Sequence, residues 1–175
     1  MGDRQPGKLV LVTGGARSGK SRFALDLARE AGERLAYLAT ARPGDSEMEA
    51  RIARHRAERG DEWLLVEEPD DPAGVLSTLG AAAVVLDCLT LWVSNRMDTR
   101  TDEEILGEDV PRLLGAAGRF PDLLIVVTNE VGLGVVPATP LGRRFRDIAG
   151  LVNQRFASEA EEVHVLWAGI PHRLK

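Results

Sequence analysis

A glycine-rich motif that directly follows an apolar run constrains the fold of this chain more than any other feature. Residues 14–21 read GGARSGKS, which matches the phosphate-loop pattern G-x-x-x-x-G-K-[ST]. Residues 9–13 are typical of a buried strand, and Phe23 and Leu27 have the spacing of a helix that begins near Lys20. Glycines let backbone N–H groups point at phosphate oxygens, and the helix N-terminus adds positive charge. The alternative, a chance glycine-rich turn, does not account for this strand–loop–helix context.

Two residues of the motif and one later carboxylate predict a metal–nucleotide site. We expect Lys20 to reach the β- and γ-phosphates and the Ser21 hydroxyl to ligate Mg²⁺. Asp87 ends the apolar run 82–86, where a metal-organising carboxylate occurs in such enzymes. Asp87 has an alternative role as a cap for a helix after Cys88, and the two roles are compatible.

Strand-like and helix-like patterns alternate along the whole chain. We expect strands at 9–13, 35–39, 63–66, 82–86, 123–128 and 163–168. Helical patterns cover 45–59, 103–120, where Pro111 breaks or restarts the helix, and the segment after Thr139 and Pro140. This alternation predicts one α/β domain over residues 1–175, with a three-layer, mostly parallel sheet and a disordered tail at 1–7. Ligands of such a sheet gather outside the carboxyl ends of its strands.

Composition excludes several other classes of protein. The net charge of −5 gives no basic face for nucleic acid. Cys88 is the only cysteine, and the three histidines lie far apart, so the sequence predicts neither a disulfide nor a zinc site. We expect no signal peptide, since the polar start is followed by only a short apolar run, and no apolar run is long enough for a membrane span, so we expect a cytoplasmic protein.

His55 lies in the helical pattern 45–59, in line with Met48 and Ile52 on the inward face. Arginines surround it, at positions that include Arg54 and Arg56. The residues alone leave two roles open, a packed helix residue or a nucleophile near phosphates. Most of an unperturbed imidazole is neutral at pH 7 and able to attack.

Six segments together resemble one known family. They read LVTGGARSGKSR, YLAT, EMEARIARHR, LDCLT, VVTNEVGLGVVP and RDIAGLVNQR, and they span residues 9–155 with gaps. They are similar to the bifunctional adenosylcobinamide kinase / adenosylcobinamide-phosphate guanylyltransferase family of cobalamin biosynthesis. A phosphate loop alone is shared by many families, whereas the last two segments are not explained by general phosphate-loop chemistry.

The resemblance implies a RecA-like fold, a homotrimer and two reactions on a corrinoid. The hydroxyl of adenosylcobinamide is phosphorylated with ATP or GTP, and GMP from GTP is then added to that phosphate. The family's covalent GMP-carrying histidine corresponds to His55. Some members have Glu at the position of Asp87, so metal contact here is either direct or water-bridged. The nucleotide contacts implied by the family are Gly14, Gly15, Ala16, Arg17, Ser18, Gly19, Lys20, Ser21, Ala39, Thr40, Ala41, Arg56, Ala57, Glu58, Arg59, Glu67 and Asp87.

Two alternatives remain beside this interpretation. One is a small-molecule kinase that transfers only the γ-phosphoryl group and uses His55 for packing. The other is a switch ATPase, in which hydrolysis moves a partner. A GMP adduct on the protein would favour the transferase over both.

Overall fold

The structure, a computed structural model, describes residues 7–42, 44, 60 and 62–175. Its centre is a seven-stranded sheet in the order β3-β2-β4-β5-β1-β6-β7, with every pair parallel except β6 and β7. The strands are β1 (Lys8–Gly14), β2 (Leu35–Ala39), β3 (Trp63–Glu67), β4 (Ala83–Asp87), β5 (Leu123–Val127), β6 (Glu162–Trp167) and β7 (Ile170–Arg173). All six predicted strands are therefore present.

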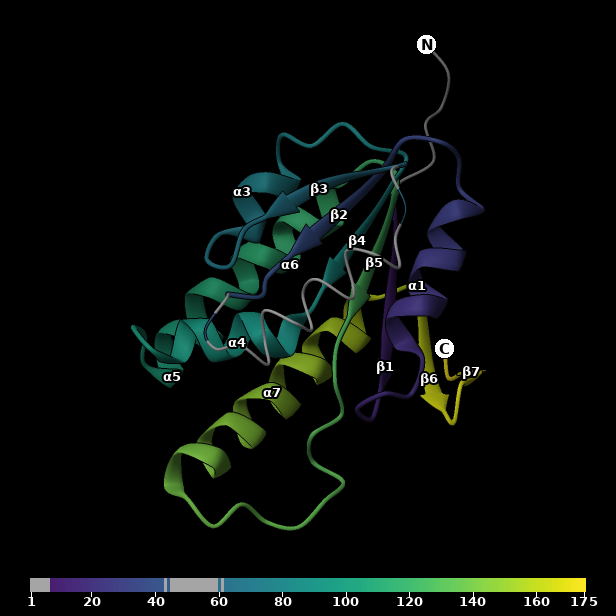
Figure 1. The fold of residues 1–175 in the computed structure, drawn as a ribbon. Coiled ribbons are helices and arrows are strands. Elements are labelled where there is room, and N and C mark those ends of the chain that lie inside the picture. Colours follow the sequence, from purple (N-terminus) through teal and green to yellow (C-terminus); the bar gives the residue numbers. More distant parts are fainter. Residues whose placement is uncertain (1–6, 43, 45–59, 61) are drawn as a thin grey trace.

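Helices cover both faces of the sheet (Figure 1), which confirms the predicted three-layer arrangement. On one face, α1 (Lys20–Arg29) packs against β1, β4 and β5. The opposite face carries α3, α4, α6 and α7. Their bounds, with those of the short helix α5 and the π-helical turn η1, are α3 (Pro72–Leu76), α4 (Leu89–Met97), α5 (Asp102–Glu104), η1 (Ile105–Asp109), α6 (Val110–Arg119) and α7 (Pro140–Glu159).

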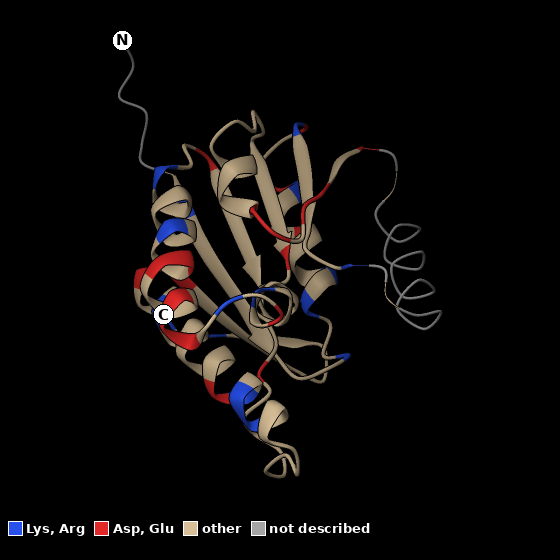
Figure 2. Ribbon diagram, turned by 90° about the vertical axis from the view of Figure 1, so that its left-hand side faces the viewer, with Lys and Arg blue, Asp and Glu red and all other residues tan. Residues whose placement is uncertain are grey.

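Strand β1 shows how the sequence produces two cores. Leu9 and Leu11 belong to the hydrophobic core under α6 and α7, whereas Val10 and Val12 belong to the core under α1. Successive strand residues point to opposite faces, so an unbroken apolar run fills both cores. Figure 2 shows the strands almost free of charge, with Lys, Arg, Asp and Glu on helices and loops.

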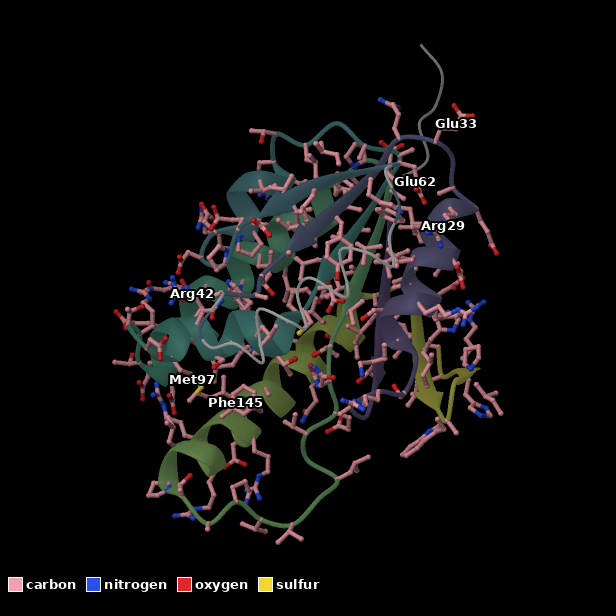
Figure 3. The ribbon with its side chains drawn as sticks, in the orientation of Figure 1. Arg29, Glu33, Arg42, Glu62, Met97 and Phe145 are labelled. Atoms are coloured by element: carbon pink, nitrogen blue, oxygen red, sulfur yellow. The ribbon has the colours of Figure 1, made fainter. Side chains whose placement is uncertain are left out.

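Helix α7 begins as predicted, because the Thr139 side chain accepts a hydrogen bond from the Gly142 N–H at 3.1 Å. Its buried face includes Val152 and Phe156. Figure 3 shows Phe145 of α7 close to Met97 of α4, and both pack against the same core. Leu141 has the sequence spacing of this face, four residues before Phe145, but it does not lie in the core. Leu141 is 64% exposed, because the first turn of α7 extends past the core.

Pro111 restarts the helix rather than ending it. The chain runs from α5 through η1 into α6, and Pro111 lies in the first turn of α6. The helix is continuous through this point, and the π-helical turn directly before Pro111, in which the Val110 N–H bonds to the Ile105 carbonyl oxygen, already interrupts the α-helical hydrogen-bond pattern where the proline lacks its N–H.

The C-terminal end of the chain differs from the sequence prediction. No strand was predicted after residue 168, but residues 170–173 form β7, which pairs antiparallel with β6. The predicted helix 45–59 lies outside the described residues, as does the predicted tail except for Gly7. Within the described ranges, no helix is long and apolar enough to cross a membrane.

Candidate active site

The loop between β1 and α1 has the backbone of a phosphate cradle. Gly14 and Gly19 have positive φ angles of 145° and 95°, and Arg17 has one of 57°. A Cβ atom on Gly14 would lie 2.6 Å from the Leu166 carbonyl oxygen, so only glycine fits there. Gly19 is the N-cap of α1 in the left-handed conformation. These angles curl the loop at the N-terminus of α1, where its N–H groups are available to phosphate.

Lys20 folds back over this loop. Its side chain is 7% exposed, and its Nζ donates to the Gly15 carbonyl oxygen at 2.6 Å and lies 3.5 Å from Ser18 Oγ. The ammonium group is therefore held within the curl of the loop, where the motif requires it to meet the β- and γ-phosphates.

Ser21 and Asp87 meet although they are 66 residues apart in the sequence. Ser21 Oγ donates to Asp87 Oδ2 at 2.8 Å, and Tyr37 Oη donates to the same oxygen at 2.7 Å. The N-cap of α4 is Cys88, with no side-chain cap bond, so Asp87 does not cap that helix. The structure thus brings the two predicted metal ligands together.

The register of the parallel sheet aligns Asp87 with two more of the predicted positions. Ala39 pairs with Glu67 on one side and with Asp87 on the other, so the three residues form one row. Neighbouring strands lie about 4.8 Å apart, which places the Cα atoms of Glu67 and Asp87 about 10 Å apart. Glu67 is exposed and Ala41 is half-buried.

Thr40 uses all of its polar groups within the protein. Its Oγ1 donates to the Cys88 carbonyl oxygen and accepts from the Cys88 N–H, both at 2.8 Å. Its N–H donates to the Asp87 carbonyl oxygen, and its own carbonyl oxygen accepts from Asn95 Nδ2. Thr40 therefore fixes the end of β2 to the end of β4.

Sequence reasoning missed a larger cluster to which Thr40 belongs, here called the polar network. Asn129 Nδ2 donates to Thr90 Oγ1 at 2.8 Å. Asn153 Nδ2 donates to the Asn129 carbonyl oxygen, and Asn153 Oδ1 accepts from Thr128 Oγ1 at 2.7 Å. The network comprises Thr40, Cys88, Thr90, Asn95, Thr128, Asn129 and Asn153. It ties the carboxyl ends of β2, β4 and β5 to α4 and α7, and it gives a structural role to Thr128 and Asn129 of the TNEVG segment and to Asn153 of the VNQ segment.

Two backbone contacts tie the loop to its neighbours. The Glu130 N–H donates to the Gly14 carbonyl oxygen at 3.0 Å, and the Gly169 N–H donates to the Ser18 carbonyl oxygen at 3.0 Å. The loop is therefore fastened on one side by the segment after β5 and on the other by the β6–β7 turn. The sequence signal for these contacts was weak, since each donor is a backbone group.

The second predicted part of the site, His55 with Arg56, Ala57, Glu58 and Arg59, lies outside the described residues. The chain leaves the described residues near Arg42, which follows the carboxyl end of β2 and forms ion pairs with Asp70 and Asp98. That end of β2 is on the same edge of the sheet as the phosphate loop. His164 instead contacts Glu162 at 3.1 Å and the Phe23 ring at 5.2 Å, which is a packing role.

Comparison with known proteins finds one matching family model and several relatives. Residues 10–174 match the model described as cobinamide kinase / cobinamide phosphate guanyltransferase. The bifunctional adenosylcobalamin biosynthesis protein CobP of Pseudomonas aeruginosa is 45% identical, over 94% of this chain and 96% of the relative. CobU of Escherichia coli, with the same description, is 39% identical over 95% of this chain and 99% of the relative.

Solved structures confirm the RecA-like phosphate-loop fold. The RadB recombinase superposes with a TM-score of 0.52 at 20% identity, over 94% of this chain and 76% of that one. A KaiC-like protein from Pyrococcus horikoshii gives 0.52 at 18% identity, over 91% and 71%.

Proposed function

Because this chain belongs to the cobinamide kinase / cobinamide phosphate guanyltransferase family, and so to the kinases and nucleotidyltransferases, we propose two successive reactions for it. It phosphorylates the side-chain hydroxyl of adenosylcobinamide with ATP or GTP, and it then joins GMP from GTP to that phosphate. The products are adenosylcobinamide-GDP and pyrophosphate. The observation that carries this proposal is the pairing of a curled phosphate loop and inward Lys20 with the Ser21–Asp87 contact.

We further propose that Ser21 and Asp87 hold a Mg²⁺ ion, and their geometry supports this. Mg²⁺ takes oxygen ligands at about 2.1 Å in an octahedron, so two adjacent ligands lie about 3 Å apart. The 2.8 Å between Ser21 Oγ and Asp87 Oδ2 is close to that spacing. Mg²⁺ also usually keeps waters and substrate phosphates as its remaining ligands, so one carboxylate and one hydroxyl are sufficient. When bound, the ion would neutralise charge on the phosphates.

In the kinase reaction the chain's own groups orient the triphosphate and stabilise the transition state, and none of them forms a covalent bond to the transferred group. The loop N–H groups orient the triphosphate, and Lys20 neutralises charge that develops on the transferring group. The corrinoid hydroxyl attacks the γ-phosphorus, the bond to the β-γ bridging oxygen breaks, and the hydroxyl proton leaves to solvent. Because this transfer needs no covalent enzyme intermediate, His55 is not required for it.

In the second reaction we propose that His55 carries GMP. Its neutral imidazole attacks the α-phosphorus of GTP, a P–N bond forms, and pyrophosphate leaves. A phosphate oxygen of the phosphorylated corrinoid then attacks the same phosphorus and releases the imidazole. The support is the family position of His55 and the arginine-rich sequence around it.

Labelled GTP tests this mechanism. The α-labelled nucleotide should label the protein, the γ-labelled one should not, and mild acid should remove the label because a phosphoramidate is acid-labile. His55→Ala should abolish both labelling and guanylyl transfer while kinase turnover stays near wild type. Label on His55→Ala protein would place the nucleophile elsewhere. A wild-type protein that phosphorylates the corrinoid but never takes up label would contradict the covalent mechanism, and a plain kinase would then be the better interpretation.

We also propose a homotrimer in the cytoplasm, since closed cyclic assemblies are the usual form of homo-oligomers. Exposed apolar side chains such as Leu133, Val135 and Leu141 are compatible with subunit contacts. Light scattering should report a trimer of the 19.0 kDa chain. A monomer at assay concentration would contradict this.

A further inference from the structure

Glu130 is joined to the start of the phosphate loop, although it lies far from the loop in the sequence. Its N–H donates to the Gly14 carbonyl oxygen at 3.0 Å, and Figure 1 shows the segment after β5 beginning beside the loop. Lys20 Nζ donates to the carbonyl oxygen of the next residue, Gly15, at 2.6 Å. Because consecutive Cα atoms are about 3.8 Å apart, the Glu130 nitrogen and the Lys20 ammonium are at most about 11 Å apart. Glu130 therefore lies beside the place where the terminal phosphate of a bound nucleotide is expected.

The carboxylate of Glu130 has one oxygen available for a substrate. Its Oε1 accepts a hydrogen bond from the Gly132 N–H at 3.1 Å. Among the residues that the structure describes, no basic side chain pairs with this carboxylate, and Oε2 has no partner. Glu130 is half-buried and Gly132 is exposed, so solvent reaches this part of the chain. An ionised carboxylate with a free oxygen can accept a proton from a neighbouring hydroxyl.

The other carboxylates that end or follow a parallel strand have different surroundings. Asp87 accepts hydrogen bonds from Ser21 and Tyr37 and is the proposed metal ligand. Glu67 ends β3, which is four strand spacings from β1, or about 19 Å. The carboxylates that follow β3 bond to backbone N–H groups or to arginines, and they are Glu68, Asp70 and Asp71. Glu130 follows β5, the direct neighbour of β1, and so lies nearest to the start of the loop.

We propose that Glu130 is the general base of the kinase reaction and takes the proton of the attacking hydroxyl. This inference rests on the phosphorylation of adenosylcobinamide in the proposed function. The hydroxyl oxygen forms its bond to the γ-phosphorus while the bond to the β-γ bridging oxygen breaks. The nucleoside diphosphate leaves with that electron pair, and the hydroxyl proton passes to the Glu130 carboxylate and from there to solvent.

The distances required for this step are compatible with the position of Glu130. In a reactive complex the attacking oxygen is about 3–3.5 Å from the phosphorus. A base within hydrogen-bond reach is about 2.6–3.2 Å from that oxygen, which places it about 6 Å from the γ-phosphorus. Lys20 contacts the same phosphoryl group from within the loop. A glutamate whose backbone is at most about 11 Å from the Lys20 ammonium can place its carboxylate at that distance.

The guanylyl transfer serves as an internal control, because its attacking atoms carry no proton that must be removed. They are the neutral imidazole nitrogen of His55 and an ionised oxygen of the corrinoid phosphate. Loss of a general base at Glu130 should therefore affect the first reaction and spare the second. Loss of a residue that only supports the loop should affect both.

Glu130→Gln keeps the shape of the side chain and its bond to Gly132, but it removes the ability to take a proton. It should lower kcat for phosphorylation of adenosylcobinamide about 100-fold. The KM for ATP should stay within about twofold of wild type, because the base acts only in the transition state. Transfer of GMP to ready-made adenosylcobinamide phosphate should be unchanged. Formate should restore part of the kinase turnover of Glu130→Ala, since a small carboxylate can take the proton in place of the missing one.

Glu159→Gln is the matched control. Glu159 is an exposed glutamate at the end of α7, close to the start of β6 and thus at the opposite edge of the sheet. This variant should match wild type in both reactions. Wild-type kinase turnover of Glu130→Gln, or an equal loss of both reactions, would overturn the base. A selective loss of kinase turnover without rescue by formate would assign Glu130 an electrostatic role and also overturn it.

The proposed function can fail separately. Without corrinoid, water takes the acceptor position, and release of phosphate from ATP measures this slow reaction, which Glu130→Gln should also lower. Wild-type protein that releases phosphate in this Glu130-dependent way but never phosphorylates adenosylcobinamide would overturn the proposed reaction and leave the base standing. Equal corrinoid phosphorylation by wild type and Glu130→Gln would overturn the base and leave the reaction standing. Protein that transfers phosphate to neither acceptor would overturn both.

Discussion

The phosphate loop and the polar network are neighbours at the carboxyl edge of the sheet, and they present their polar groups in opposite ways. In the loop, positive φ angles turn the backbone toward a ligand, and Ala16 and Arg17 are exposed. In the network, Thr40 and Thr128 are fully buried, and side chains bond to each other and to the protein backbone. Both regions carry sequence that marks the family. We therefore expect the loop residues to act on the nucleotide and the network residues, including Thr40, to keep the strand ends in place.

The largest expected effect is a loss of turnover without a loss of stability, and it should distinguish the phosphate loop from the polar network. Lys20→Ala should lower both kinase and guanylyltransferase turnover about 100- to 1000-fold, the effect of losing one electrostatic donor in a transition state. Its free energy of unfolding should stay within about 1 kcal/mol of wild type, because residues at functional sites are not selected for stability. Steady-state assays and urea unfolding measure the two quantities.

Lys8→Ala is the control for Lys20→Ala, since it removes an ammonium group outside the loop, where Lys8 pairs with Glu162. Its turnover should match wild type. Near-normal turnover of Lys20→Ala in either reaction would remove the loop from that reaction.

Asp87 lies where the two regions meet, and it should behave like the loop. Asp87→Asn removes one charge from the proposed metal site, so the Mg²⁺ concentration for half-maximal activity should rise about 10- to 100-fold. Tyr37→Phe removes only a hydroxyl that donates to the same carboxylate, and it should shift that concentration far less. An unchanged Mg²⁺ titration for Asp87→Asn would rule out its role in metal binding.

Asn153 tests the other side of the comparison. Asn153→Ala leaves the buried Thr128 hydroxyl and the Asn129 carbonyl oxygen without their partner, which should cost about 1–3 kcal/mol of unfolding free energy. The protein that remains folded should keep turnover within a few-fold of wild type. Gln154→Ala, an exposed neighbour on α7, should change stability by less than about 0.5 kcal/mol. A stable Asn153→Ala enzyme with 100-fold lower turnover would contradict the division between the two regions.

The smallest expected effect comes from a charged pair outside both regions. Hydrogen bonds from Lys8 and then His164 hold the pKa of Glu162 below its usual 4.5. A lowered carboxyl pKa stabilises the fold above pH 4.5, and this contribution is lost as the pH falls below that value. Glu162→Gln should therefore lower the melting temperature slightly at pH 7, and the difference should shrink near pH 3.5. A difference that is the same at both pH values would exclude this ionic contribution.

The parts of the fold that the sequence predicted are those with strong local signals. Buried apolar runs located the six parallel strands, and Thr139 with Pro140 located the start of α7. Strand β7 was missed because all four of its residues are exposed and Pro171 interrupts any strand pattern. Helix α3 has only five residues, too few to show a helical period.

The residues of the candidate site also divide into those that a local sequence signal predicted and those that it did not. The loop was predictable because its residues are consecutive, and Asp87 because it ends an apolar run. The polar network was not predictable, because Asn129 bonds to Thr90, 39 residues away, and Asn153 bonds to Asn129, 24 residues away. The turn at Gly169 was hidden because its contact with the loop is made by the backbone. Spatial neighbours that are distant in sequence leave no local pattern.

The place of β1 in the sheet has a consequence for synthesis on the ribosome. The neighbours of β1 are β5 and β6, at residues 123–127 and 162–167, and the loop is fastened by Gly169. At about 5–20 residues per second, the nascent chain carries its loop sequence for roughly 7–30 s before the last of these partners exists. We expect nucleotide affinity to arise only after the last residues are released. A prematurely terminated chain would then contain the whole motif and still not sequester GTP or ATP.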